Sequence, residues 1–226
     1  MRAPGSHWLA AAVLIASAGG CASSGGTEPS PPAPAGRSDA EIEALFRARQ
    51  DSARMRFTAA DVDFMTGMIH HHAQALHMTR LAIPHGASPQ VQTLAARITN
   101  AQRDEIALMQ QWLRDRDQPI PKVHVTDSEV AVHGPGHAHD MPGMLTPDQL
   151  RELEAARDAA FDRTFLTLMI QHHRGAVTMV HELFATDGAA QDEEAFRIAS
   201  DVQVDQITEI ARMESMLEAM GQAGGS

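Results

Sequence analysis

Two pairs of adjacent histidines stand far apart in this sequence, each in a hydrophobic segment that predicts the buried face of a helix. The first pair is His71-His72 in MIHHHAQALHM, and the second is His172-His173 in MIQHHRGAVTM. Four methionines flank them at matching positions, namely Met68, Met78, Met169 and Met179. Imidazole and thioether groups together suit Cu(I) and, by extension, Ag(I). The pattern predicts a duplicated internal metal site.

Helical periodicity divides the histidines of the first segment into two groups. At about 100° per residue, His71 and His72 share the apolar face of the helix, whereas His70 and His77 lie nearly opposite. The second segment repeats the inward positions and lacks the outward histidines. We therefore expect His71 and His72 to face the core and His70 and His77 to be peripheral.

A second repeated motif brings carboxylates to the same interior. Gln102-x-x-Glu105-Ile-x-x-Met recurs as Gln206-x-x-Glu209-Ile-x-x-Met, and each motif forms one helical stripe. Buried polar groups without partners cost about 1–3 kcal/mol each, so something must satisfy these side chains. Two solutions stay open: a closed network in which the imidazoles donate to Glu or Gln, or a metal ion bound by His, Met, Glu105 and Glu209. Met68 and His72 lie one turn apart and can bind one ion from a single helix.

The elements that position these residues are all predicted to be helical. Ser38 with Glu41 and Thr58 with Asp61 fit capping boxes, Ser88-Pro89 and Thr146-Pro147 fit helix starts, and no strand-like alternation is expected. The long helices are expected at about 58–82, 89–113, 159–184 and from 189 to about 220. Two tandem helical hairpins, each too small to bury its own face, predict an all-α, pseudo-symmetric four-helix bundle over residues 38–220.

The loop between the two hairpins, at about 115–146, is rich in histidine and methionine and is expected to be non-helical. Its candidate ligands are His133, His137, His139, Met141 and Met144. Because the segment shows no hydrophobic periodicity, packing does not explain them. We expect this loop to load metal ions.

The amino terminus predicts export. Residues 1–20 read as a signal peptide, and Ala18-Gly-Gly-Cys21 resembles a lipobox that would lipidate Cys21 and anchor the protein to a membrane. Residues 21–37 form a Pro/Gly/Ser-rich tether. Cys21 is the only cysteine, so intrachain disulfides are excluded. The expected location is the cell envelope or periplasm.

The charge balance excludes one class of partner. The net charge is −11 with only 18 Lys and Arg residues, which argues against nucleic acid binding. An acidic surface attracts cations.

At these residues the sequence resembles the bacterial domain of unknown function 305 family. The matching features are FMTGMIHHHAQALHM, MPGML, FDRTFLTLMIQHHRGAVTM and the two Gln-x-x-Glu-Ile-x-x-Met motifs, from about residue 58 to residue 217. The resemblance implies a ferritin-like four-helix bundle that is exported or lipid-anchored. For the few members with an assigned role, it also implies periplasmic copper binding through His and Met. Carried over by motif, the candidate ligands are Met68, His71, His72, Met78, Met141, Met144, Met169, His172, His173 and Met179.

Three functions follow from these features. The first is a non-enzymatic protein that binds copper, as Cu(I) or Cu(II), or another transition metal, for sequestration or resistance. The second is a di-metal oxidase of iron or manganese, although the helices lack the Glu-x-x-His motif of di-iron bundles. The third is a metal-free envelope interaction module with a buried histidine network.

Overall fold

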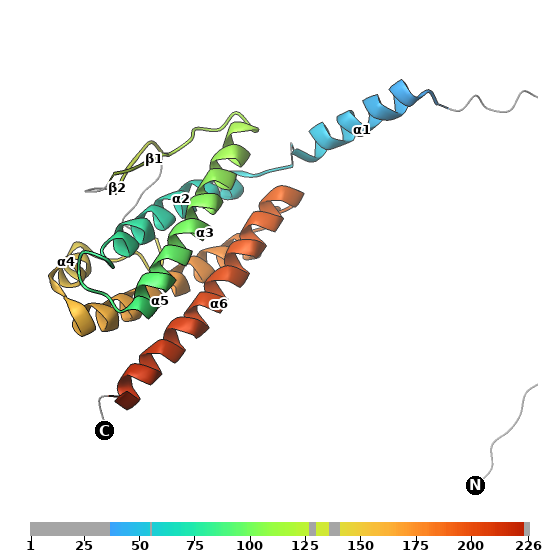
Figure 1. Cartoon of the computed structure of the whole chain (residues 1–226). Coiled ribbons are helices and arrows are strands. Elements are labelled where there is room, and N and C mark those ends of the chain that lie inside the picture. Colours follow the sequence, from blue (N-terminus) through green and yellow to red (C-terminus); the bar gives the residue numbers. More distant parts are fainter. Residues whose placement is uncertain (1–36, 55, 127–129, 136–140, 224–226) are drawn as a thin grey trace, which may run out of the picture.

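The computed structural model describes residues 37–54, 56–126, 130–135 and 141–223 (Figure 1). The predicted signal peptide, Cys21 and the tether up to residue 36 lie outside the described residues. Along the chain, the elements are α1 (Asp39–Arg54), α2 (Ala59–Arg80), α3 (Pro89–Arg114), β1 (Lys122–Val125), β2 (Val130–His133), α4 (Pro147–Ala155), α5 (Asp158–Ala185) and α6 (Glu193–Ala223).

The predicted all-α four-helix bundle is confirmed. α2 packs against α3, α5 packs against α6, and the two hairpins meet through α2 with α5 and α3 with α6. The helix starts follow the predicted chemistry: Thr58 and Asp61 form a capping box, Ser88 accepts from the backbone of Val91, and Thr146 begins α4. These caps satisfy amide groups that have no intrahelical partner.

A polar layer divides the apolar core into two clusters. The first cluster includes Phe64, Met65, Met68 and Ile69 of α2 and Ala176, Met179, Val180 and Leu183 of α5. The second includes Ala75 and Met78 of α2 and Phe161, Phe165, Leu166 and Met169 of α5. Between them, α2 and α5 contribute their paired histidines, and α3 and α6 contribute the glutamines and glutamates of their repeated motifs. All eight of these side chains are buried: His71, His72, Gln102, Glu105, His172, His173, Gln206 and Glu209.

A small antiparallel hairpin was not predicted from the sequence. β1 pairs with β2, with Lys122 opposite His133 and Val125 opposite Val130. Val123 and Val130 pack against the first apolar cluster, and β2 contacts α2. The central loop therefore covers one side of the bundle instead of remaining wholly irregular.

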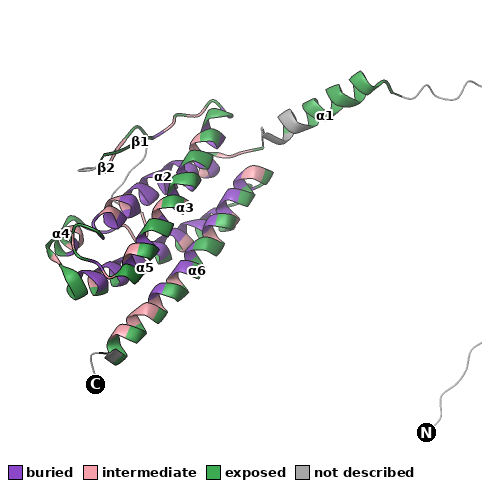
Figure 2. Ribbon diagram, in the orientation of Figure 1, coloured by how far each residue is buried: buried purple, intermediate pink, exposed green. Residues whose placement is uncertain are grey.

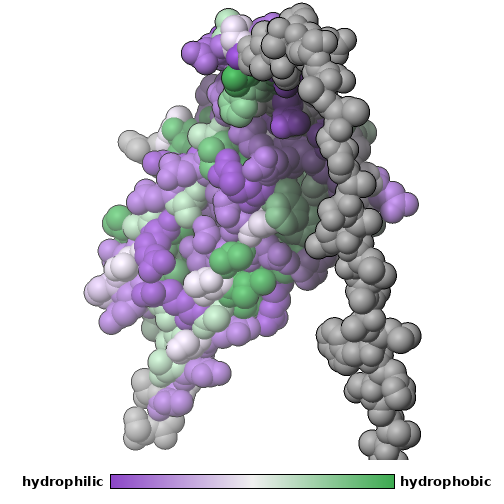
Figure 3. All heavy atoms as spheres, turned by 90° about the vertical axis from the view of Figure 1, so that its right-hand side faces the viewer, coloured by the Kyte–Doolittle hydropathy of each residue, from purple (hydrophilic) through white to green (hydrophobic). Residues whose placement is uncertain are grey.

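Helix α1 differs from the rest because the described side chains of residues 39–49 are all exposed (Figure 2). They include Ile42, Leu45 and Phe46. On the face shown in Figure 3, hydrophilic residues surround separate hydrophobic areas. No helix within the described ranges combines the length and apolar character that crossing a membrane requires.

Candidate metal centre

The two histidine pairs meet in the middle of the bundle, as the periodicity predicted. His71 and His72 come from α2, His172 and His173 come from α5, and all four side chains are fully buried. The ring centroids of His71 and His172 are 3.8 Å apart, with the planes tilted by 40°. The centroids of His172 and His173 are 6.2 Å apart. Residues from separate motifs thus form one imidazole cluster.

Each hairpin holds one histidine with a carboxylate from its second helix. His72 Nε2 lies 2.6 Å from Glu105 Oε2, and His173 Nε2 lies 2.7 Å from Glu209 Oε2. A carboxylate that binds one ring nitrogen fixes the ring and leaves the other nitrogen for a ligand. Glu105 and Glu209, which we predicted as metal ligands, are therefore placed to orient the imidazoles.

His71 is held by the backbone of the MPGM segment. Its Nε2 donates to the carbonyl oxygen of Pro142 at 3.0 Å. Because a carbonyl oxygen only accepts, the proton is on Nε2 and the lone pair is on Nδ1. The segment is tied to α2 a second time, since the Gln74 amide bonds both the N–H and the carbonyl of Leu145.

Two glycines allow the MPGM segment to lie this close. Gly143 has a φ of +75°, which favours glycine, and a Cβ at Gly175 of α5 would lie only 2.1 Å from the carbonyl oxygen of Pro142. The same Cβ would lie 2.5 Å from Gly143 Cα. The motif therefore forms a close backbone contact with α5 that covers the histidine cluster.

Much of the polar layer has no hydrogen-bond partner in the protein. Among the described side chains, the unpaired buried atoms include Nδ1 of His71, His72 and His173, both ring nitrogens of His172, both amide atoms of Gln102, and Gln206 Oε1. Each such group costs about 1–3 kcal/mol when it is buried without a partner. A bound cation would give these nitrogens a partner.

The environment keeps the central rings neutral. Burial first, and the neighbouring His72 next, lower the pKa of His71 to about 3. Burial and then His71 lower the pKa of His172 well below its ordinary value. A neutral imidazole keeps the lone pair that a metal ion needs.

The four methionines of the histidine segments lie on both sides of the polar layer. Met68 and Met179 belong to the first apolar cluster, and Met78 and Met169 belong to the second. Within the part of the chain that the structure describes, no three His, Cys, Asp or Glu side chains already converge as a metal cage. The donors at hand are imidazole nitrogen and thioether sulfur, a set that fits soft monovalent ions.

The predicted loop ligands that the structure describes are exposed or half-buried, unlike the four buried histidines. His133 is exposed on β2, and its ring centroid lies 5.4 Å from that of His124. His137 and His139 lie outside the described residues. Met141 is half-buried with its sulfur near Gly67, and Met144 is also half-buried.

One sequence prediction about histidine orientation was wrong. His70 was expected to face outward, yet its side chain is buried and its Nε2 lies 2.8 Å from the carbonyl oxygen of Pro135. The segment after β2 covers that face of α2, so a position opposite the core is also enclosed. His77 is partly exposed beside Glu154, at 3.1 Å, as expected of a peripheral residue, and His181 of α5 is exposed.

Sequence reasoning did not find the Pro142 carbonyl or Gln74. The carbonyl belongs to the backbone and carries no residue-type signal, although the MPGM motif marked its place. Gln102 and Gln206 were placed on the inward stripe but were not proposed as part of the site.

The family resemblance is confirmed. Residues 61–217 match the family described as Domain of unknown function (DUF305), and the chain belongs to that family. A comparison with curated proteins gives no match.

Solved structures of similar proteins agree with this assignment. A DUF305 fragment from Deinococcus radiodurans is 28% identical, with a TM-score of 0.59 over 72% of this chain and 98% of that one. A DUF305 protein from Streptomyces coelicolor, classed as secreted, is 27% identical, with a TM-score of 0.57 over 72% and 94%. CopM in its Cu(II)-bound form is 26% identical, with a TM-score of 0.54 over 71% and 97%. CopM has also been solved with Cu(I) and with Ag.

Proposed function

We propose that this protein binds a soft transition-metal ion, Cu(I) or Ag(I), outside the cytoplasm and holds it in the buried histidine layer. The observation that carries the proposal is the set of imidazole nitrogens, on His71, His72, His172 and His173, that are buried without a protein partner. The ring nitrogens that do have partners are held by Glu105, Glu209 and the Pro142 carbonyl.

Ligand chemistry favours copper and silver over harder ions. In the proposed site, His Nδ1 atoms bind the ion, Met68 and Met169 supply thioether sulfur from the two sides of the layer, and the glutamates position the rings. Thioether and imidazole donors prefer Cu(I), whereas carboxylate-rich sites prefer Mg, Mn or Ca. The binding of Cu(I), Cu(II) and Ag by the similar protein CopM supports this choice.

The proposed role is binding rather than catalysis. The donors that face the layer suit sequestration or delivery of an ion, and both glutamates already bond histidines. The proposal also includes export through the predicted signal peptide and anchoring through Cys21. The similar Streptomyces coelicolor protein, which is classed as secreted, supports the export.

Competition for Cu(I) tests the proposal. The purified protein is titrated against a chromogenic Cu(I) chelator of moderate affinity, and we expect it to remove copper from the chelate in a fixed stoichiometry. The double variant His71→Leu, His172→Leu removes the two adjacent rings without separating either Glu from its histidine. We expect it to lose at least about tenfold in affinity.

His181→Gln is the matched control, because His181 is an exposed histidine of α5. Its affinity should equal that of the wild type. Failure of the wild-type protein to compete with the chelator would overturn the proposal.

A further inference from the structure

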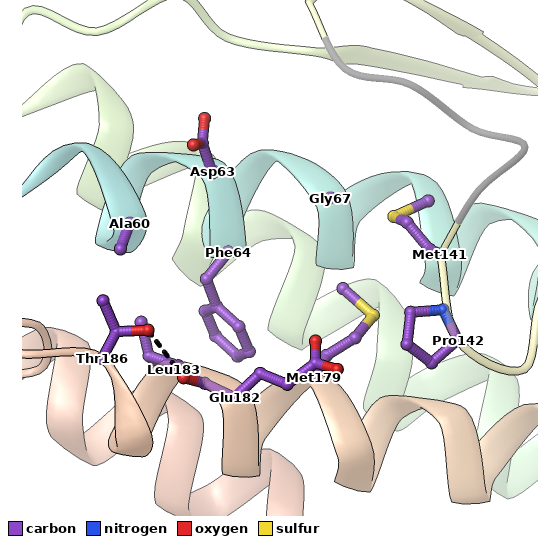
Figure 4. A pocket seen from close by; sticks show the side chains of 10 residues that line it. All are labelled: Ala60, Asp63, Phe64, Gly67, Met141, Pro142, Met179, Glu182, Leu183 and Thr186. Carbon is purple, nitrogen blue, oxygen red and sulfur yellow. Dashed lines mark hydrogen bonds between the residues drawn. The ribbon is translucent and has the colours of Figure 1, made fainter.

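The strongest unexplained feature is a pocket of about 360 Å³ beside the histidine layer. It opens between α2 and α5, and its lining includes Asp63, Gly67, Met141, Met179 and Glu182. Figure 4 shows the Met141 and Met179 side chains at the same end of the pocket, next to Gly67. Two thioethers from different segments therefore share one accessible cavity.

Gly67 leaves space for the ends of both methionine side chains. A Cβ at this position would lie 3.1 Å from Met141 Sδ and 3.4 Å from Met179 Cε. The absence of a side chain on α2 thus leaves room in which both methionine ends approach the same surface of the helix. Met141 also lines a second pocket of about 480 Å³ that shares Asp63 and Gly67, so its thioether lies between two open spaces.

The pocket adjoins the buried histidines. Pro142 lines the pocket, and its carbonyl oxygen is the group that bonds His71 Nε2 at 3.0 Å. Gly67 and His71 are one helical turn apart on the same face of α2, which corresponds to a rise of about 6 Å. The pocket and the buried histidine layer are therefore separated by one residue of the MPGM segment and one turn of α2.

The exposed side of the pocket is acidic. Asp63 and Glu182 are exposed carboxylates that line it, one on α2 and one on α5. Carboxylates of one sign around a cleft raise the local concentration of cations and their rate of entry.

We propose that this pocket is the entry port for the ion: Asp63 and Glu182 attract a soft monovalent cation, Met141 and Met179 bind it transiently, and it passes beside Gly67 to the His71–His172 pair. This inference rests on the proposed function and adds the route by which the ion reaches the buried histidines. The transfer is an exchange of thioether ligands for imidazole ligands. The ion keeps its oxidation state, and no proton has to leave the acceptor nitrogens.

The first test separates the route from the final site by measuring rate and affinity together. Cu(I) transfer from a chromogenic chelate is followed in a stopped-flow instrument for the wild type and for Met141→Leu, Met179→Leu, a change that nearly conserves volume. We expect transfer to slow by about tenfold, with the equilibrium affinity changed by less than about threefold, because the histidines are intact. Met220→Leu is the control, since Met220 lies near the far end of α6.

The carboxylates are tested in the same way. Asp63→Asn, Glu182→Gln should slow transfer by about two- to tenfold and weaken its dependence on salt, because steering by charge is screened. Asp104→Asn, Glu218→Gln removes two exposed charges elsewhere and should leave the rate unchanged.

The second test observes the pocket directly. With methionine methyl groups labelled for NMR, Ag(I) added to His71→Leu, His172→Leu should still shift the Met141 and Met179 signals, assigned by substitution. Three results would each overturn the proposed entry port. They are an unchanged transfer rate in the methionine variant, an equal loss of rate and affinity in that variant, and no shift of these two NMR signals. Absence of Cu(I) binding by the wild type would overturn the proposed function and the port together.

Discussion

His71 and His172 lie side by side at the centre of the bundle, with ring centroids 3.8 Å apart and ring planes tilted by 40°, although they belong to different helices and to widely separated motifs. Both rings are fully buried. His71 has one unpaired nitrogen and His172 has two. Such an arrangement is costly in a metal-free core, and it places two imidazoles with unpaired nitrogens side by side.

The two glutamates should act through the histidines that they hold. Glu105→Gln and Glu209→Gln each replace a charge-assisted bond to a buried imidazole with a neutral one. We expect Ag(I) or Cu(I) affinity to fall by about 10- to 100-fold for the double variant, with the helical content unchanged. Isothermal titration checks the affinity and circular dichroism checks the fold. Glu218→Gln, on an exposed position of α6, should behave as the wild type, and equal affinities throughout would contradict the positioning role.

The close contact between the MPGM segment and α5 should not tolerate a methyl group. Gly175→Ala places a Cβ 2.1 Å from the Pro142 carbonyl oxygen, so the segment must move, at an expected cost of about 1–3 kcal/mol. Gly221→Ala is the matched control in a helix, because a Cβ there meets nothing within 4 Å. Urea unfolding compares the two. Equal stability of the two variants would show that the contact is not tight in solution.

A buried ion pair should stabilise the end of the bundle that the histidines do not reach. Arg116 and Asp192 lie 2.6 Å apart with almost no exposure, and Asp192 also accepts from Trp112. Asp192→Asn removes the shorter, buried partner and leaves Arg116 only the partly exposed Glu194 at 3.3 Å. We expect a loss of about 1.5–3 kcal/mol, the range for hydrogen bonds to charged groups. The surface pair Arg197–Asp201, at 3.7 Å, is the control, where Asp201→Asn should cost about 0–1 kcal/mol. A small effect at Asp192 would contradict the assignment.

The same aspartate sets part of the acid limit of stability. Burial would raise the pKa of Asp192, but its bonds from Arg116, Trp112 and the Ala195 amide outweigh burial and lower it. With a folded pKa below the unfolded value of 3.8, its contribution is present above that value and is lost as the pH falls through the folded pKa.

The buried histidines should make the metal-free protein less stable at mildly acidic pH. The pKa of His71 is about 3 in the folded chain, against its ordinary value of 6.5, so between these values the unfolded chain binds a proton that the folded chain excludes. Stability therefore falls as the pH drops below 6.5, by about 2 kcal/mol at pH 5 for His71 alone. Urea unfolding of metal-free protein at pH 7.5 and pH 5 measures this. His71→Leu should have a weaker pH dependence than His181→Gln, and identical pH dependence in the two variants would contradict the prediction.

The fold and the inner histidines could be predicted because both follow from the helical period. Met68 and His72 lie on the apolar stripe of α2, so the first histidine pair faces the core. The second pair lies on the matching stripe of α5, so the two pairs meet inside the bundle. The period could not predict His70, because burial on that face comes from the segment after β2. The hairpin itself left a weak signal, the alternating valines of KVHV and VAVH, which is too short to stand out beside the histidines.

The Pro142 contact shows a different limit. It joins a backbone carbonyl to His71, and it depends on Gly143 and Gly175 lying in contact across the bundle. No residue type encodes such a pairing, so the role of the MPGM segment became clear only from the structure.

The most direct measurement of the central claim is the unfolding free energy of the protein with and without Ag(I), beside Zn(II) and Mn(II), for the wild type and for His71→Leu, His172→Leu. At 100 times its dissociation constant, an ion that binds only the folded state adds about 2.7 kcal/mol. We expect Ag(I) to stabilise the wild type by about this amount, the other two ions to do so less, and the double variant to lose most of the gain. No stabilisation by Ag(I), or the same stabilisation in the double variant, would contradict a metal site in the buried histidine layer.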